Sequence, residues 1–274
     1  MGEQPPRIYS DSLGTEIYDV LGTAIRDGGP TTGDIAFFQR LADESGGPVL
    51  EIGCGTGRVA GALAAAGFEV VGVDRSDPML RLAEERRAAL PPEAAARLAF
   101  VRGDMTTLEL GRQFALIIAP SRVFQFALTS DDQRAALRAF RAHLASDGRL
   151  VLDLFDPSLE YLVPGAIFPP RSGELVHPKT GNLVTWDIAG REPDPSQQLV
   201  VSDWSAREIG PSGEVLRDET ERLTLRWSTR SEMRLLFELE GLEVVADYGD
   251  FNGGPPTYGS EQVWVLRKSD RRPS

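Results

Sequence analysis

The sequence has little cysteine or histidine chemistry to offer: it contains one cysteine, Cys54, and two histidines among 274 residues. A single cysteine excludes a disulfide framework and a cysteine-based zinc site. No apolar stretch reaches the ~18–20 residues of a membrane helix, and the opening residues lack the basic and apolar regions of a signal peptide. We therefore expect a cytoplasmic protein with no membrane span and no bound metal.

The chain also lacks an excess of positive charge, with 29 Lys and Arg against 41 Asp and Glu and a net charge of −12. Such a field repels phosphate backbones, so nucleic acid is not an expected partner. Hydrophobic residues make up 41% of the chain, enough for a full core. The length suits one large α/β domain or one domain that carries an insertion.

Short apolar strands alternate with helices through the middle of the chain. Strands are predicted at 47–53, 68–74, 98–104, 114–120 and 149–156, and helices at 12–26, 58–67, 76–90 and 130–148. The helix at 130–148 is predicted to begin with a Ser130–Gln133 capping box and to end at Gly148. Repeated βα units with near-continuous apolar strands indicate a parallel sheet covered on both faces.

Between about 165 and 228 the helical period disappears. Alternating segments such as Val184, Trp186 and Ile188 predict an antiparallel meander there. The α/β pattern returns with a Thr229–Glu232 capping box, a helix and two strands. We therefore divide the chain into an α/β domain of residues 1–164 and 229–274 and an antiparallel β insertion of residues 165–228.

The loop after the first of these strands, "LEIGCGTGR", contains three glycines, Gly53, Gly55 and Gly57. Ligands of open parallel sheets bind beyond the carboxyl ends of the strands, where glycines let the backbone approach them closely. The dinucleotide fingerprint is G-x-G-x-x-G, whereas here Arg58 stands in the place of its third glycine. Asp74 ends the next strand 21 residues after Gly53, where a ribose-binding carboxylate is expected.

This combination, with "GDM" at the end of the third strand, resembles the class I S-adenosylmethionine-dependent methyltransferases. The resemblance covers about residues 12–160 and resumes in 229–267. It implies a Rossmann-like, seven-stranded, doubly wound α/β sheet. It also implies S-adenosylmethionine as the cofactor and S-adenosylhomocysteine as the product.

The resemblance assigns roles to the glycine loop. Gly53, Cys54 and Gly55 would bring backbone against the methionine part of the cofactor. Glu51 would lie beneath the loop and orient it, and Arg58 would reach toward the cofactor carboxylate. Cys54 is not expected to be a nucleophile, because no histidine lies near it in the sequence and a small residue is needed there.

The ends of the second and third strands receive roles in the same way. Asp74 would bind both ribose hydroxyls, with Arg75 and Met79 beside the adenine. Asp104 would accept from the adenine amino group, and Met105 would offer backbone to the ring.

Ala119 and Pro120 end the fourth strand and would line the methyl-transfer end of the site. Family members that methylate base amines carry Asn/Asp-Pro-Pro-aromatic there, and metal-dependent catechol enzymes place an Asp there. This chain has "APSRVFQF" instead. We therefore expect metal-independent transfer to an N- or O-nucleophile of a small organic acceptor.

A finer resemblance is to bacterial sugar N-methyltransferases and glycine/sarcosine-type enzymes. Their insertion covers the acceptor pocket or forms a dimer contact, which implies a possible homodimer through residues 165–228. Methyl transfer from a sulfonium needs mainly proximity and orientation, so no general base is identified. The candidate acceptor-pocket residues are Tyr18, Ser121, Arg122, Gln125, Tyr161, Arg226, Tyr248 and Asp250.

Two alternatives stay open at this point: a nicotinamide-binding oxidoreductase and a non-catalytic cofactor-binding module. Neither histidine is expected to act in catalysis. His143 lies on a long helix and is expected to be structural, and His177 lies in a turn and is expected to be exposed to solvent.

Overall fold

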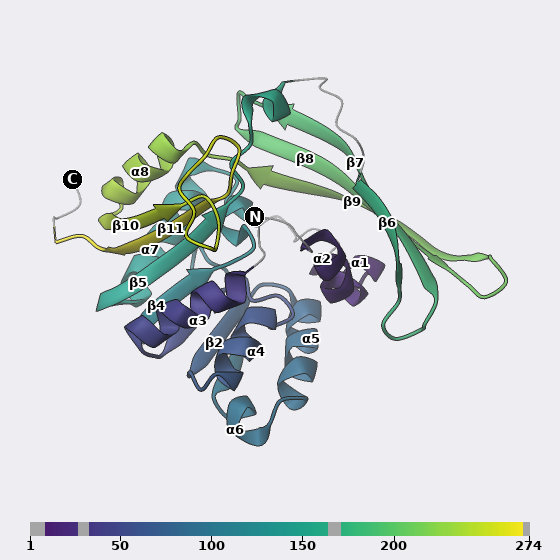
Figure 1. Cartoon of the computed structure of the whole chain (residues 1–274), viewed down its shortest axis with the longest axis horizontal. Helices are drawn as coiled ribbons and strands as arrows, with labels where there is room; N and C mark the ends of the chain where they lie inside the picture. Colours follow the sequence, from purple (N-terminus) through teal and green to yellow (C-terminus); the bar gives the residue numbers. More distant parts are fainter. Residues whose placement is uncertain (1–8, 27–32, 164–170, 271–274) are drawn as a thin grey trace. The chain divides into compact units, whose positions relative to one another are not determined.

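The computed structural model describes residues 9–26, 33–163 and 171–270 of the chain (Figure 1). The chain divides into two compact units, a larger one of residues 30–157 and 226–274 and a smaller one of residues 1–29 and 158–225. The N-terminal helices therefore group with the antiparallel insertion, whereas we predicted that they are part of the α/β domain. Residues 165–170 of the predicted insertion lie outside the described residues.

The larger unit contains a seven-stranded sheet in the order β10-β11-β5-β4-β1-β2-β3. β1 to β5 pair in parallel, and β11 is antiparallel to both β5 and β10. This order confirms the predicted doubly wound sheet. The strands are β1 (Val49–Ile52), β2 (Val70–Asp74), β3 (Leu98–Arg102), β4 (Phe114–Ala119), β5 (Leu144–Leu154), β10 (Leu242–Tyr248) and β11 (Gln262–Lys268).

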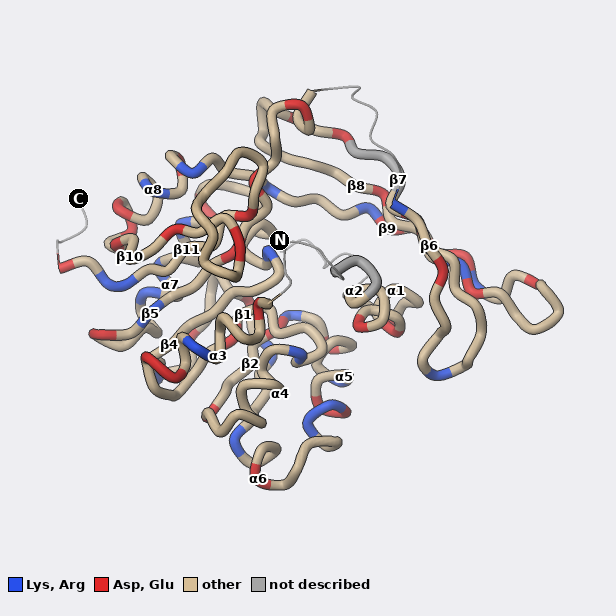
Figure 2. The backbone as a smooth tube through the Cα atoms, viewed as in Figure 1, with Lys and Arg blue, Asp and Glu red and all other residues tan. Residues whose placement is uncertain are grey.

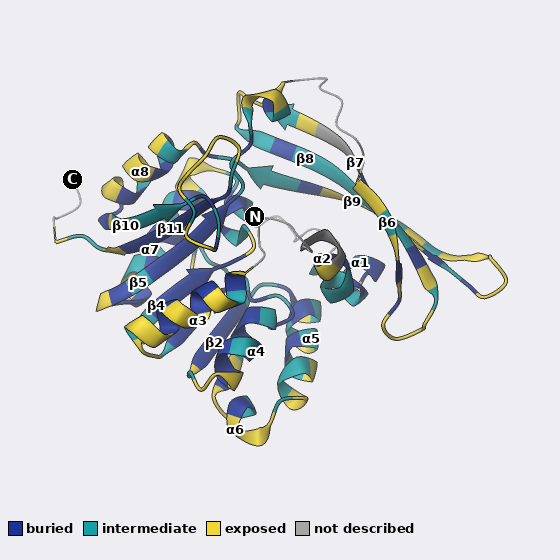
Figure 3. Ribbon diagram, viewed as in Figure 1, coloured by how far each residue is buried: buried dark blue, intermediate teal, exposed yellow. Residues whose placement is uncertain are grey.

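Helices cover both faces of this sheet, whose central strands are buried (Figure 3). α3 (Asp34–Ser45) and α4 (Arg58–Ala65) pack on one face, and α7 (Ser130–His143) and α8 (Arg230–Leu239) pack on the other. α5 (Asp77–Ala88) packs against β3. Two short segments complete the unit, α6 (Pro92–Ala95) and the 3₁₀ turn η2 (Val123–Phe126), and η2 directly follows the end of β4.

Most helix starts follow the predicted capping chemistry. Ser76 caps α5, and Thr229 and Glu232 form the predicted capping box at α8. The prediction for α7 was displaced by one residue, because Thr129 is extended and its side chain accepts the Asp132 N–H. α7 also ends at His143 rather than at Gly148, since Leu144 is extended and pairs with β4.

The smaller unit holds a four-stranded sheet in the order β6-β7-β8-β9. β7 is antiparallel to both β6 and β8, and apolar residues on one face of the sheet pack on Leu13, Ile17 and Leu21. Ile17 interrupts the single helix predicted at 12–26. The elements are α1 (Leu13–Glu16), α2 (Tyr18–Arg26), η3 (Leu159–Leu162), β6 (Arg171–Val176), β7 (Leu183–Asp194), β8 (Leu199–Ile209) and β9 (Val215–Arg226).

Polar side chains attach α1 to this sheet. Glu16 accepts hydrogen bonds from His177 Nε2 at 2.9 Å and from Arg217 at 3.0 Å. His177 is 1% exposed, so the predicted exposure to solvent was wrong. Its Nδ1 also accepts the backbone N–H groups of Lys179 and Thr180, so both ring nitrogens have partners in this buried position.

Among the described residues, no helix is both long and apolar enough to cross a bilayer. Lys and Arg are interspersed with Asp and Glu along the backbone of both units (Figure 2).

Candidate functional site

The glycine loop adopts a backbone that side chains rarely permit. The φ angles of Gly53, Gly55 and Gly57 are +65°, +52° and +72°. A Cβ at Gly53 would lie 2.1 Å from a methyl carbon of Val123, and one at Gly57 would lie 2.6 Å from the Phe100 ring. A Cβ at Gly55 would meet nothing within 4 Å. The first and third glycines are therefore required by their neighbours, and the middle glycine faces open space.

Asp74 ties this loop to the end of β2. One oxygen of its carboxylate accepts the Gly55 N–H at 2.8 Å, and the other accepts the Ser76 N–H at 2.8 Å. Burial raises the pKa of Asp74. A carboxylate has about four acceptor positions, so both oxygens can also take ligand hydroxyls. The structure adds a role in loop positioning to the predicted ribose contact.

Glu51 lies on β1, two residues before Gly53, and is 2% exposed. Its Oε2 has no hydrogen-bond partner, and burial raises the pKa of this carboxyl to about 8. A buried polar atom without a partner is costly and is rare in folded proteins. The unpartnered oxygen fits a donor supplied by a bound molecule.

Cys54 is a small buried residue of the loop and not a reactive thiol. Its side chain is 5% exposed and fills the space beside Gly72 of β2, where a Cβ would lie 2.9 Å from the sulfur. Burial raises the pKa of the thiol well above its usual value, which disfavours the thiolate.

Arg58 was predicted to reach the cofactor carboxylate, and here its guanidinium forms an ion pair with Asp34. Asp34 begins α3 and is 4% exposed. The predicted role of Arg58 stays a prediction, because it requires a contact additional to this pair.

The predicted adenine residues lie at the ends of β2 and β3. Met79 is fully buried on α5, and Arg75 is half-buried. Asp104 accepts two hydrogen bonds from Thr106, through the backbone N–H at 2.8 Å and the hydroxyl at 2.6 Å. Met105 is half-buried and packs against the core. Their contacts with adenine stay predictions.

The turn after β4 follows two buried residues, Ala119 and Pro120. Ser121 and Arg122 then both have a positive φ, of 59° and 64°. The Arg122 guanidinium pairs with Glu261 and lies 5.1 Å over the Phe155 ring. Residues outside glycine rarely adopt this backbone, and those that do cluster at functional sites.

Sequence reasoning missed the buried carboxylates Asp153 and Glu261, which are 0% and 4% exposed. Burial raises the pKa of both, to about 8 for Asp153. Asp153 and Glu51 point to the same face of the sheet, because each alternates with apolar residues that face the other side. The charge of Asp34 acts on both. One signal was available for Asp153: like Glu51, it interrupts an apolar strand near its carboxyl end.

Several acceptor-pocket candidates are occupied by structural contacts in the larger unit. Gln125 is fully buried; its side-chain oxygen accepts the Phe155 N–H at 2.7 Å, and its amide donates to the Arg226 carbonyl at 2.9 Å. The Tyr248 ring packs edge-on against Phe37, and Asp250 accepts two backbone N–H groups of its own loop. The prediction for Gln125 is corrected, since its polar atoms serve the fold.

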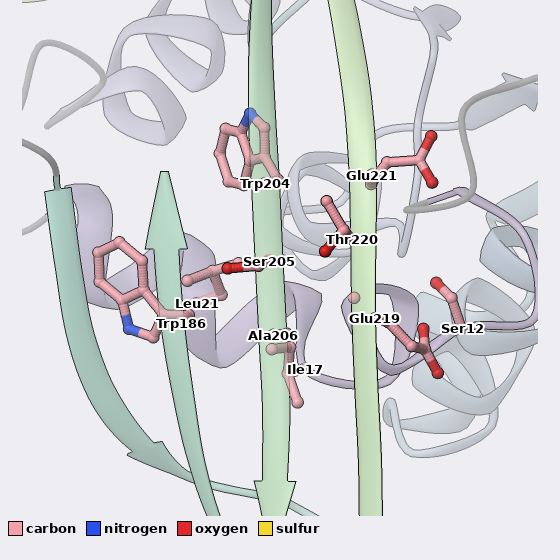
Figure 4. A pocket seen from close by; sticks show the side chains of 11 residues that line it. Ser12, Ile17, Leu21, Trp186, Trp204, Ser205, Ala206, Glu219, Thr220 and Glu221 are labelled. Carbon is pink, nitrogen blue, oxygen red and sulfur yellow. The ribbon is translucent and has the colours of Figure 1, made fainter. Parts of the chain in front are cut away.

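Tyr18 and Tyr161 belong to the smaller unit and are half-buried. That unit has a narrow pocket between its sheet and α1, lined by Ile17, Leu21, Trp186 and Trp204 among others (Figure 4). The indole nitrogens of both tryptophans are buried without a partner. They do not converge on a common point in Figure 4, so they do not define a polar binding site.

The described residues contain no group of three or more His, Cys, Asp or Glu side chains that could hold a metal ion. His143 is structural, as expected: Nε2 accepts the Leu110 N–H at 2.9 Å.

A glycine loop at the end of β1, an acid at the end of β2 and the strand order together define a cofactor-binding sheet of the methyltransferase type. Residues 49–148 match the family described as "Methyltransferase domain". The chain is 29% identical over 269 residues to the cypemycin N-terminal methyltransferase of a Streptomyces species, covering 95% of this chain and 97% of that protein.

Two further comparisons agree. The chain is 26% identical to the dTDP-4-amino-2,3,4,6-tetradeoxy-D-glucose N,N-dimethyltransferase of Saccharopolyspora spinosa, over 87% of this chain and 88% of that protein. The solved structure of the CcbJ methyltransferase from Streptomyces caelestis matches with a TM-score of 0.73 and 26% identity, covering 94% and 98% of the two chains. The protein is a class I S-adenosylmethionine-dependent methyltransferase. The nicotinamide and non-catalytic alternatives are not supported.

Proposed function

We propose that this enzyme transfers the methyl group of S-adenosylmethionine to an amine nitrogen of a small organic acceptor. The glycine loop supports the assignment of the cofactor, because it has open space at Gly55 and lies next to a Glu51 oxygen without a partner. The relatives support an amine acceptor, because their names specify an N-terminal and an N,N-dimethyl transfer.

The residues present fit this cofactor. The free oxygen of Glu51 can accept from the cofactor ammonium, and the loop at Gly55 can lie against the methionine chain. Asp74 keeps acceptor capacity for the ribose hydroxyls after its two backbone bonds. The strained turn at Ser121 would form the wall at the methyl-transfer end.

When bound, S-adenosylmethionine supplies a methyl group that passes to the nitrogen as the carbon–sulfur bond breaks, and the nitrogen then loses a proton. The chain contributes proximity, orientation and exclusion of water. The carboxyl groups near the turn are matched by guanidinium groups, Asp34 by Arg58 and Glu261 by Arg122, so the amine preference rests on the relatives.

The test is a screen of acceptors in matched pairs, each amine beside its hydroxyl counterpart, with formation of S-adenosylhomocysteine as the readout. Amino-sugar nucleotides and peptides with a free N-terminus form the first panel. We expect turnover with the amine member only. Turnover of a hydroxyl member would contradict the amine proposal, and failure to bind S-adenosylhomocysteine in calorimetry would contradict the cofactor assignment.

We also propose that residues 165–228 act in acceptor binding or in a homodimer contact, and that nucleic acid is not a partner. Analytical ultracentrifugation measures the oligomeric state. A monomer at micromolar concentration would contradict the proposed dimer contact.

A further inference from the structure

The turn after β4 is held in a conformation that its own residues disfavour. Ser121 and Arg122 are consecutive left-handed residues, and neither is glycine. In this region the Cβ crowds the backbone, so such a conformation persists only where surrounding structure imposes it. The turn stands at the carboxyl end of the strand next to β1, on the ligand side of the sheet.

Asp153 of β5 provides one of the contacts that impose this conformation. Its Oδ2 accepts the backbone N–H of Arg122 at 3.0 Å. The Arg122 side chain folds back to Glu261 and Phe155, which leaves Ser121 exposed at the top of the turn. A backbone bond to a buried side chain fixes the turn more directly than the ion pair does, because it acts on the left-handed residue itself.

The turn in this conformation also touches the glycine loop. A methyl carbon of Val123 lies 2.1 Å from the place that a Cβ would take at Gly53. Val123 follows Arg122 directly, so a change of backbone at Arg122 would move Val123 off the loop. Asp153, Arg122 and Val123 thus connect β5 to the first glycine of the cofactor loop.

The buried carboxyl of Asp153 is only partly satisfied by hydrogen bonds. It is 0% exposed, and its Oδ1 has no partner. A fully buried carboxyl with an unsatisfied oxygen is a costly way to fill a strand position. The bond to the Arg122 N–H gives this costly buried group a role.

We propose that Asp153 is a positioning residue for methyl transfer, which holds the Ser121–Arg122 turn against Gly53 and so sets the wall of the methyl-transfer end. It acts through Arg122 and Val123 and does not touch the reacting atoms. This inference rests on the proposed cofactor site. It assigns a function to a residue that the motif alone did not single out.

The test uses the full chain with S-adenosylmethionine carrying ¹³C in its methyl group, which reports on that end of the site without an acceptor. Asp153→Asn keeps a carbonyl oxygen for the Arg122 N–H, and Asp153→Ala removes it. In the Ala variant we expect a bound methyl resonance moved toward the free position and an affinity for S-adenosylhomocysteine about tenfold weaker. The Asn variant should keep the wild-type resonance and affinity.

Glu240→Ala is the matched control, because Glu240 is also a buried carboxylate, 5% exposed and paired with Arg134. It should lower the melting temperature and leave the methyl resonance in place. If Asp153→Ala does not fold, Val123→Ala tests the same connection, and we expect it to move the resonance as well.

Three results would overturn the inference: a wild-type resonance in Asp153→Ala, a wild-type resonance in Val123→Ala, or an Asn variant that behaves like the Ala variant. The last would show that the acidic group acts directly on a ligand. Absence of any S-adenosylmethionine binding by the wild-type protein would instead refute the proposed cofactor site itself.

Discussion

Carboxylates have different surroundings in the two units. In the larger unit, burial raises the pKa of Glu51 and Asp153 to about 8, and each has one oxygen without a partner. In the smaller unit, burial acts to raise the pKa of Glu16, but hydrogen bonds from Arg217 and His177 outweigh it and lower the pKa. Bonds from Thr180 and Asn182 lower the pKa of Glu208.

The difference separates carboxylates whose oxygens are satisfied by the fold from carboxylates that keep an oxygen without a partner. Glu16 and Glu208 lie in networks that join α1, the turn at His177 and β9. Glu51 and Asp153 lie at the carboxyl edge of the sheet, where the fold gives them few partners. The comparison predicts that changes at this edge affect binding first, and that changes in the networks of the smaller unit affect stability alone.

We expect the largest loss of affinity for S-adenosylhomocysteine from Gly55→Val. The side chain would enter the open space at Gly55 and block the approach of the cofactor to the backbone. We expect affinity for S-adenosylhomocysteine to fall by at least about 100-fold, or 2.7 kcal/mol. Calorimetry measures the affinity, and circular dichroism checks that the fold is kept.

Gly111→Val is the matched control, because Gly111 also has a positive φ, +66°, and open space around it in the same unit. It carries the same backbone strain away from the loop. Equal affinities of the two variants would show that strain, and not obstruction, explains any loss.

Asp74→Ala should have the next largest effect. It removes the predicted ribose acceptor and the bond to the Gly55 N–H. We expect a loss of about 1–3 kcal/mol in binding of S-adenosylhomocysteine, as for an unpaired site of charged hydrogen bonds. Asp77→Ala, three residues on at an exposed position, should bind like the wild type. Unchanged affinity in Asp74→Ala would remove Asp74 from the site.

The third prediction concerns pH. Asp and Glu titrate near 4 in unfolded chains, whereas Glu51 and Asp153 titrate at about 8 when folded. Between these values the folded protein holds more protons, so the free energy of unfolding falls as the pH rises from about 4 to about 8. The slope is about 1.4 kcal/mol per pH unit for each group. Glu51→Gln and Asp153→Asn should each flatten it in urea unfolding.

The charges that act on these two groups are Arg58, Asp74 and Asp34 around Glu51, and Glu261, Arg122 and Asp34 around Asp153. Glu208 should change the free energy of unfolding with pH in the opposite direction, because its pKa is lowered. Its contribution to stability is present above its unfolded pKa and is lost as the pH falls, so Glu208→Gln should weaken the loss of stability in acid. If the Glu51, Asp153 and Glu208 variants all changed the pH dependence of the free energy of unfolding in the same direction, the contrast between the two units would be wrong.

The smallest effect is expected from Arg217→Ala in the smaller unit. Its ion pair with Glu16 is about one-third exposed on each side, so solvent screens it. We expect a loss of about 0.5–1 kcal/mol in the free energy of unfolding and no change in affinity for S-adenosylhomocysteine. A weaker affinity in this variant would show that the network of the smaller unit supports binding after all.

Local patterns predicted the sheet and the loop. The strands, the glycines and Asp74 could be found because each depends on residues close together in sequence. Thr129 and Ser130 show the limit of such patterns: both residues can cap a helix, and only the backbone angles decide which one does. The predicted exposure of His177 failed for a related reason, since its cover comes from α1, far away in the chain.

The wall of the site could not be predicted, because its parts come from distant segments. Asp153 and Arg122 are 31 residues apart, and Arg122 and Glu261 are 139 apart. Periodicity gives no measure of which strands become neighbours. The grouping of α1 and α2 with the insertion was missed for the same reason, since the apolar faces that they share are separated by most of the chain.

The buried position of Cys54 allows the opening of the glycine loop to be measured by thiol labelling. It is the only thiol of the chain, and it is sealed between the loop and Gly72 of β2. An alkylating reagent can reach the sulfur only when the loop leaves the strand, so the rate of labelling measures the free energy of that opening. A bound ligand that holds the loop slows the labelling, which gives a binding assay that needs no acceptor and no engineered label.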